Sequence, residues 1–314
     1  MIELSCPISE EKLRKNLKLE EGSTAAAAEI ESSSGPEECF TTLDGGRVRY
    51  LQAGSGPPLV LLHGLLGYSF SWRFNLEALA QQRRVLALDQ LGVGFSDRPR
   101  DLTCTMRAVA ARTLAFIDQQ APGPFDLLGT SHGGAIAMWV AAQMAERGDR
   151  RLQRLILVAP ANPWSTRGRR LAPFFAQPPV SAALHSILPR ASFVWGFFIR
   201  RMYGDPARMP PGTVKGYSAA LARDRSWEYG LSVLESWIED LEGLKTLLPK
   251  LADLPTLLIW GDADPAVYPE SAEPLREYFR NCEYVRLPGV GHLPYEEAPA
   301  EFNRAVTEFL QKPL

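Results

Sequence analysis

The sequence predicts an α/β protein in which helices cover both faces of a mostly parallel sheet. Short apolar runs, typical of strands buried on both faces, alternate with helical stretches over most of the chain. Alternation at this spacing favours parallel strands joined by crossover helices. The alternation stops between Ala159 and Thr256, where prolines, large aromatics and helical patterns predict an inserted helical cap.

The expected core elements follow in chain order. Strands are expected at Val48–Gln52, Leu59–Leu62, Arg84–Leu88, Phe125–Leu128, Leu155–Ala159, Thr256–Trp260 and Glu283–Leu287. Helices are expected at Ser71–Gln82, Thr105–Gln120, Gly134–Arg147, Ser271–Phe279 and Ala300–Gln311. Residues 39–161 and 251–314 would then form the core domain, and residues 162–250 the cap. Residues 1–38, with a charged run and a Ser–Gly–Pro stretch, predict a short helix followed by a flexible leader.

Composition limits the class of partner. The chain has 314 residues, 46% of them hydrophobic, which is enough for a large core. A formal net charge of -2 provides no overall field to attract nucleic acid or an anionic membrane. We therefore expect a small-molecule substrate and no nucleic-acid partner.

Cysteines and apolar segments indicate a cytoplasmic protein without a membrane span. The chain has four widely spaced cysteines, Cys6, Cys39, Cys104 and Cys282. Without a C-x-x-C pair they predict free thiols and no metal site. The most apolar stretch, Ala191–Ile199, is far shorter than the roughly 20 residues that a spanning helix needs. An interfacial role for the segment around Phe193–Phe198 stays open.

The segment Gly129–Gly133 fits the pattern G-x-S-x-G and lies between an expected strand and an expected helix. A sharp turn at this place needs small neighbours and exposes the hydroxyl of Ser131. The start of the following helix would direct backbone N–H groups toward a developing oxyanion. Ser131 is therefore the candidate nucleophile.

A serine nucleophile needs a base, and that base needs a carboxylate. Of the four histidines, His292 follows the last expected strand, in a loop at the edge where such sites collect their groups. His63 is expected to have a structural, hydrogen-bonding role. Asp262 and Asp264 both follow the strand ending at Trp260, and the residues alone leave either one as the acid.

Taken together, these motifs resemble the α/β-hydrolase fold family, over residues 40–312. The order serine, acid, histidine matches that family. His63–Gly67 is similar to its H-G-x-x-G turn, and Asp89–Asp97 is similar to a D-x-x-G-x-G-x-S segment of its capped members. The resemblance implies a mostly parallel sheet of about eight strands.

The resemblance also implies roles for site residues. It favours Asp264 as the acid and gives the backbone N–H groups of Leu65 and His132 as oxyanion donors. The implied reaction is two-step acyl transfer without a metal or organic cofactor. The aromatic-rich cap would contribute an apolar pocket above Ser131, so the expected substrate is a small-to-medium, largely apolar ester.

Related reactions of the same fold differ in how well they fit these residues. Haloalkane dehalogenases and epoxide hydrolases of the family have aspartate at the position of Ser131, which disfavours their chemistry here. Carbon–carbon bond hydrolases of vinylogous diketones use the same triad, although Leu293 and Thr130 differ from the residues that many of them carry. A non-catalytic ligand-binding member of the fold, and a cofactor-free oxygenase or lyase, stay open as well.

Overall fold

The computed structural model describes residues 35–187 and 192–314. The helix and most of the leader expected in residues 1–38 lie outside these ranges. Strand β1 begins at Glu37, so the last two residues of the expected leader, Glu37 and Glu38, belong to the first strand.

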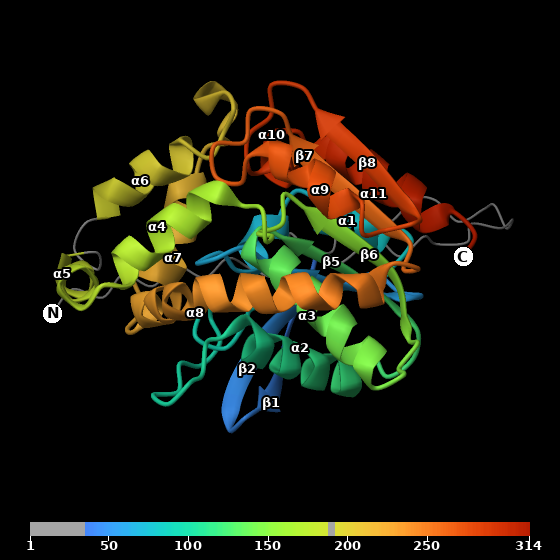
Figure 1. Ribbon diagram of the computed structural model, residues 1–314, viewed down its shortest axis with the longest axis horizontal. Helices are drawn as coiled ribbons and strands as arrows, with labels where there is room; N and C mark the ends of the chain where they lie inside the picture. The colour runs from blue at the N-terminus through green and yellow to red at the C-terminus, as the bar shows by residue number, and fades with distance from the viewer. Residues whose placement is uncertain (1–34, 188–191) are drawn as a thin grey trace, which may run out of the picture. The chain divides into compact units, whose positions relative to one another are not determined.

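An eight-stranded sheet forms the centre of the molecule (Figure 1). Its strands are β1 (Glu37–Leu43), β2 (Gly46–Ala53), β3 (Pro58–Leu62), β4 (Arg84–Leu88), β5 (Phe125–Thr130), β6 (Leu152–Val158), β7 (Thr256–Gly261) and β8 (Cys282–Leu287). Their spatial order is β1-β2-β4-β3-β5-β6-β7-β8. The pairs β1–β2 and β2–β4 are antiparallel, and every other pair is parallel. The expected fold class is confirmed.

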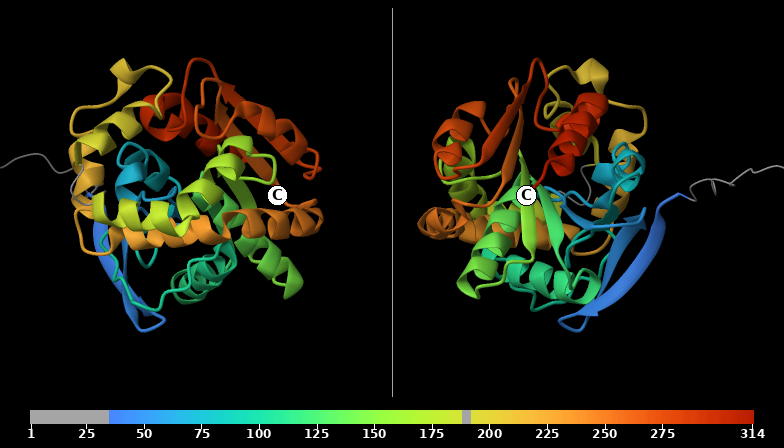
Figure 2. Two further views of the ribbon diagram at one scale, coloured as in Figure 1. Left: turned by 60° about the vertical axis from the view of Figure 1, so that its left-hand side comes forward. Right: turned by 90° about the vertical axis from the view of Figure 1, so that its right-hand side faces the viewer.

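Helices cover both faces of this sheet (Figure 2). The core helices are α1 (Leu76–Ala80), α2 (Met106–Gln120), α3 (His132–Glu146), α9 (Ala272–Arg276), α10 (Pro294–Glu297) and α11 (Pro299–Gln311). Successive strand residues point to opposite faces, so Leu59 and Leu61 of β3 pack with α1 and α11, whereas Val60 and Leu62 pack with α2 and α3. This double burial explains the near-continuous apolar strands.

Two expected helices are shorter in the structure. The pattern over Ser71–Gln82 forms a 3-10 turn, Ser69–Trp72, and then α1, with the buried Asn75 between them. The Asn75 amide donates to the backbone carbonyl of Tyr295 and to Asn303 Oδ1, contacts that a continuous helical pattern cannot reveal. The pattern over Ser271–Phe279 likewise gives only α9 after a 3-10 turn.

The insertion between β6 and β7 contains helices and, among its described residues, no strand. They are α4 (Thr166–Ala176), α5 (Pro178–Ile187), α6 (Ser192–Arg200), α7 (Thr213–Leu221) and α8 (Ser226–Leu247). We call the residues between β6 and β7 the helical insertion. Its last α-helix, α8, crosses α3 at an angle (Figure 1) and buries Leu241 and Leu244 in the core cluster that also contains residues of α2 and α3. The second half of α8 is therefore part of the core packing.

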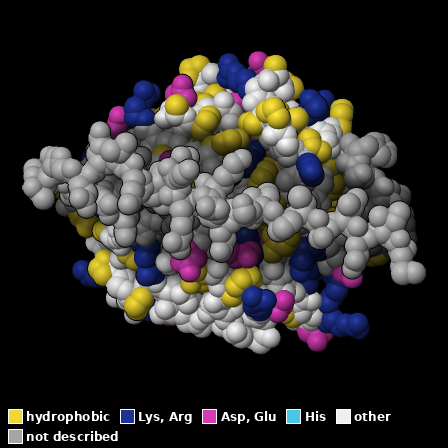
Figure 3. Space-filling view, turned by 180° about the vertical axis from the view of Figure 1, so that it is seen from behind, with side chains coloured by type: hydrophobic (Ala, Val, Ile, Leu, Met, Phe, Trp, Pro, Cys, Tyr) yellow, Lys and Arg dark blue, Asp and Glu magenta, His cyan; other side chains and the backbone are white. Residues whose placement is uncertain are grey.

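Within the described ranges no helix is both long and apolar enough to cross a membrane. The part of the rear surface that Figure 3 shows in colour carries acidic and basic side chains interspersed with apolar ones. This pattern agrees with the near-neutral charge of the chain.

Candidate active site

Ser131 lies in the tight turn between β5 and α3, in a backbone conformation that is rare for a side-chain-bearing residue (φ 54, ψ −121). The residues two positions before and two positions after it must be glycine for steric reasons. A Cβ on Gly129 would lie 2.2 Å from the carbonyl oxygen of Gly133, and a Cβ on Gly133 would lie 2.4 Å from that of His63. The close packing of this turn against β3 therefore fixes where the serine side chain starts.

His292 and Asp264 form the central side-chain contact of the site. His292 lies in the loop between β8 and α10, and Asp264 follows β7; the two side chains are buried. Nδ1 of His292 lies 2.7 Å from Oδ2 of Asp264. The other carboxylate oxygen accepts hydrogen bonds from the backbone N–H groups of Ala266 and Val267, at 2.7 and 2.9 Å. These bonds fix the carboxylate so that it can orient the imidazole.

Asp262, the second candidate for the acid, points to a different partner. Its Oδ1 accepts a 2.6 Å hydrogen bond from the backbone N–H of Gly289. This contact joins the loop after β7 to the loop after β8, and no hydrogen bond connects Asp262 to His292. In this geometry Asp262 has the loop-bracing position and Asp264 the histidine-orienting one.

Ser131 and His292 are not joined by a hydrogen bond in the described part of the chain. The serine is partly exposed to solvent, whereas the imidazole is buried. Contacts between nucleophile and base are often long in the absence of substrate and tighten in the substrate complex. The structure thus brings together the expected acid and base, and the expected nucleophile is not hydrogen-bonded to the base.

The two backbone N–H groups expected to bind an oxyanion are unpaired among the described residues. Neither Leu65 nor His132 donates its backbone N–H to a protein acceptor there. Gly64, just before Leu65, lies against the serine: a Cβ added to it would be 3.3 Å from Cβ of Ser131. Leu65 therefore follows a residue that lies against the serine, and His132 directly follows the serine in the chain.

His63 has a structural, hydrogen-bonding role, as expected. Its Nδ1 lies 2.9 Å from the carbonyl oxygen of Gly64, and its Nε2 accepts a 3.2 Å hydrogen bond from the backbone N–H of Gln90. Burial lowers the pKa of His63, so the neutral form with the proton on Nδ1 fits both contacts.

The side chain of His132 does not serve as a base in this geometry. The ring is buried and stacks on Trp237 of the helical insertion, with centroids 5.9 Å apart. Burial lowers the pKa of His132 to about 3, with a smaller contribution from the nearby His63. His132 is therefore neutral at ordinary pH.

A buried carboxylate braces the loop that follows β4. Asp89 accepts hydrogen bonds from the backbone N–H groups of Ser69 and Phe95, at 2.7 and 2.9 Å. It also forms an ion pair with Arg49 at 3.1 Å. The serine of the D-x-x-G-x-G-x-S segment, Ser96, donates to the carbonyl of Asp89 at 2.7 Å. The segment is thus a folded loop organised around one aspartate.

Sequence reasoning missed three residues at the site: Met202, Gly204 and Glu297. The N–H of His292 donates a 2.6 Å hydrogen bond to the carbonyl of Met202, which belongs to the helical insertion. Glu297 accepts a hydrogen bond from the backbone N–H of Gly204 at 2.9 Å. Contacts between segments this far apart in the chain leave no periodic signal in one sequence.

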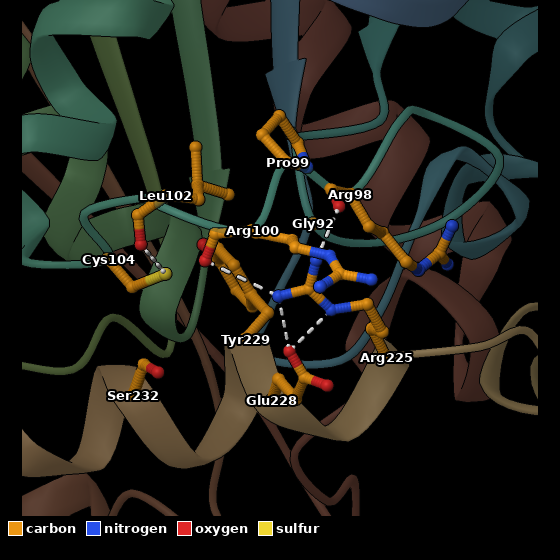
Figure 4. Close-up of a pocket in the computed structure, with 10 residues that line it drawn as sticks. All are labelled: Gly92, Arg98, Pro99, Arg100, Leu102, Cys104, Arg225, Glu228, Tyr229 and Ser232. Atoms are coloured by element: carbon orange, nitrogen blue, oxygen red, sulfur yellow. Dashed lines mark hydrogen bonds and ion pairs between the residues drawn. The ribbon is translucent and has the colours of Figure 1, made fainter.

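Neither described cavity lies at Ser131. One is lined by Arg98, Arg225 and Tyr229 beside the start of α8, where Arg225 pairs with Glu228 at 2.6 Å (Figure 4). The other is a neighbouring surface depression. Among the described residues no group of three or more histidine, cysteine or acidic side chains is arranged to hold a metal ion.

The sheet order and the serine turn define the class of protein. The model of the alpha/beta hydrolase family matches residues 59–305, so the chain belongs to that family. In a comparison of structures, the crystal structure of Cfl2 from Burkholderia cenocepacia superposes with a TM-score of 0.76 at 24% identity, covering 87% of this chain and 95% of that one.

Relatives with related sequences are named for different reactions. Haloalkane dehalogenase 2 of Mycobacterium tuberculosis is 30% identical over 275 residues, 84% of this chain and 91% of the relative. The 2-hydroxymuconate semialdehyde hydrolase of Pseudomonas sp. is 25% identical over 277 residues, 85% and 91% of the two chains. Lipase 3 of Moraxella sp. is 28% identical over 269 residues, 82% and 79%. Together they support a hydrolase without selecting its substrate.

Proposed function

We propose that this protein is a serine hydrolase that cleaves carboxylic esters by two-step acyl transfer. Ser131 is the nucleophile, His292 the general base, and Asp264 the acid that orients the base. The observation that carries the proposal is the 2.7 Å contact between His292 and Asp264, combined with a serine in a strained turn at the start of α3.

The proposed reaction follows from these positions. Ser131 Oγ attacks the ester carbonyl while His292 removes its proton. The carbonyl oxygen becomes negative and accepts hydrogen bonds from the backbone N–H groups of Leu65 and His132. His292 then gives the proton to the leaving alkoxide. The bond between the carbonyl carbon and the alkoxide breaks, which leaves the acyl group on Ser131. In the second half, His292 removes a proton from a water molecule, and the water oxygen attacks the acyl carbonyl. The bond to Ser131 Oγ then breaks, His292 returns the proton to the serine, and the carboxylic acid is released.

The substrate class is proposed from the surroundings of the base. Beside the loop of His292, a cluster of apolar and aromatic side chains joins the core to the insertion, and it includes Tyr68, Ile199, Tyr203 and Tyr217. Leu293, the residue after the base, packs against this cluster. An apolar acyl or aryl group is the substrate part that such surroundings favour.

A series of aryl esters tests the proposal. We expect turnover of 4-nitrophenyl acetate, butyrate or octanoate, with a burst of nitrophenol where deacylation is slower than acylation. Ser131→Ala should abolish both burst and turnover. Asp262→Asn is the matched control, because it removes a neighbouring carboxylate that does not contact His292. Failure of every ester with the folded wild-type protein would contradict ester hydrolysis.

A carbon–carbon bond hydrolase is the second candidate, favoured by the similarity to the 2-hydroxymuconate semialdehyde hydrolase. The same triad residues would serve it. Loss of dienol absorbance from a vinylogous diketone, without ester turnover, would replace the first candidate with this one. The dehalogenase reaction is not proposed, because the family members that perform it have aspartate where this chain has Ser131.

A further inference from the structure

We propose that Glu297 is a positioning residue that holds the loop of His292 against the helical insertion and thereby sets the place of the base. This inference rests on the proposed function for its catalytic consequence. Its structural part, the dependence of the His292–Asp264 contact on Glu297, can be measured without a substrate.

The carboxylate of Glu297 is the meeting point of two backbone segments. Its side chain is fully buried at the end of α10. One oxygen accepts hydrogen bonds from the backbone N–H groups of Gly204 and Gly291, at 2.9 and 2.8 Å. The other accepts from the N–H of Asp205 at 3.0 Å. Gly291 directly precedes the base, and the other two residues belong to the insertion.

The two segments touch so closely that only glycine fits. A Cβ on Gly204 would lie 2.4 Å from the carbonyl oxygen of Gly289, and a Cβ on Gly291 would lie 2.3 Å from that of Met202. The N–H of His292 completes the contact by donating to the same Met202 carbonyl at 2.6 Å. The base is thus held from its backbone by the insertion and from its side chain by Asp264.

A carboxylate suits this place better than any uncharged group. It accepts hydrogen bonds with two oxygens and donates none, and three N–H groups point at it. Glutamine would turn an N–H₂ group toward at least one of these donors, leaving a backbone N–H without an acceptor. The exposed Arg208 lies 3.7 Å from the carboxylate and partly offsets its charge.

Glu296 supplies a matched control. It is equally buried and precedes Glu297 in α10, but it accepts from Arg73 and Tyr203, each at 2.7 Å, and from Tyr217. None of these partners belongs to the loop of His292. Glu296→Gln should therefore weaken the packing of the insertion without directly releasing the backbone of the base.

The test compares Glu297→Gln and Glu296→Gln in the full chain. The first readout is the downfield proton resonance of the hydrogen bond between His292 and Asp264. We expect Glu297→Gln to shift or broaden it and Glu296→Gln to leave it in place. The second readout is the rate of fluorophosphonate labelling at Ser131, which should fall about tenfold to a hundredfold for Glu297→Gln and less than threefold for Glu296→Gln.

Thermal unfolding of both variants separates positioning from folding. An unchanged resonance in folded Glu297→Gln overturns the proposal. The proposal is also overturned if Glu297→Gln and Glu296→Gln lose the same amount of stability and the same fraction of their labelling rate. If the wild type does not label, the proposed function fails, but the resonance of Glu297→Gln still decides the role of Glu297. Glu297→Ala, which removes all three contacts, should reproduce the change if it folds.

Discussion

The backbone N–H of His292 donates a 2.6 Å hydrogen bond to the carbonyl of Met202, so the loop after β8 is held by the helical insertion. The imidazole meanwhile contacts Asp264, which follows β7. The candidate base is therefore fixed by two separate parts of the chain. Substitutions in either part should therefore alter the reactivity of His292, and the contacts above indicate in which direction.

Asp264→Asn should lower ester turnover about a thousandfold or more, because an amide cannot stabilise the charged imidazole and favours the wrong tautomer. Asp262→Asn should stay within a few-fold of the wild type, since its partner is the N–H of Gly289. Steady-state kinetics on the best ester measures both. A larger loss in Asp262→Asn than in Asp264→Asn would reverse the assignment of the acid.

Ser131→Gly should be more stable than Ser131→Ala by about 1 kcal/mol, because glycine accepts a positive φ that strains any residue with a Cβ. Urea unfolding of the two inactive variants measures the difference. Equal stability, or a more stable alanine variant, would mean that the turn stores no strain at this residue.

Gly133→Ala should lower the free energy of unfolding by about 1–3 kcal/mol, because the new methyl group would lie 2.4 and 2.5 Å from the carbonyl oxygens of His63 and Leu62. Gly123→Ala is the control, since a Cβ there meets no atom within 4 Å. The comparison uses chemical denaturation of both proteins. A harmless Gly133→Ala would show that the turn can move away from β3.

His132 should make the fold sensitive to acid. Its pKa in the folded protein is about 3, below its ordinary value of 6.5, so stability is complete above pH 6.5 and is lost as the pH falls from 6.5 toward 3. His132→Phe keeps a ring for Trp237 and removes the titration. Between pH 7.5 and 5.5 the wild type should lose about 1 kcal/mol more than this variant. If urea unfolding shows that both proteins lose the same free energy of unfolding, the acid sensitivity comes from groups other than His132.

The sheet was predictable from the sequence wherever strands are buried on both faces. The runs at Leu59–Leu62 and Arg84–Leu88 recur in the structure with shifts of at most one residue. Strand β1 was not predicted, because this edge strand exposes most of its side chains and gains its structure by pairing with β2. Its Glu37–Glu38 start therefore resembles the leader in the sequence.

The residues of the candidate site likewise fall into those that the sequence predicts and those that it does not. The serine, the histidine and the two aspartates could be found because each stands in a local motif after a strand. The choice between Asp262 and Asp264 needed the family resemblance, since both lie in one short loop. Glu297 and Met202 could not be found, because their importance arises from contacts between the insertion and the loop of His292.

Fluorophosphonate labelling of the wild type, Ser131→Ala and His292→Ala, with peptide mapping by mass spectrometry, tests directly whether Ser131 is an activated nucleophile. We expect one adduct, on the peptide that contains Ser131. It should be absent in Ser131→Ala and form far more slowly in His292→Ala. A folded wild-type protein that forms no adduct, or forms it on another residue, would contradict the proposal that Ser131 carries the reaction.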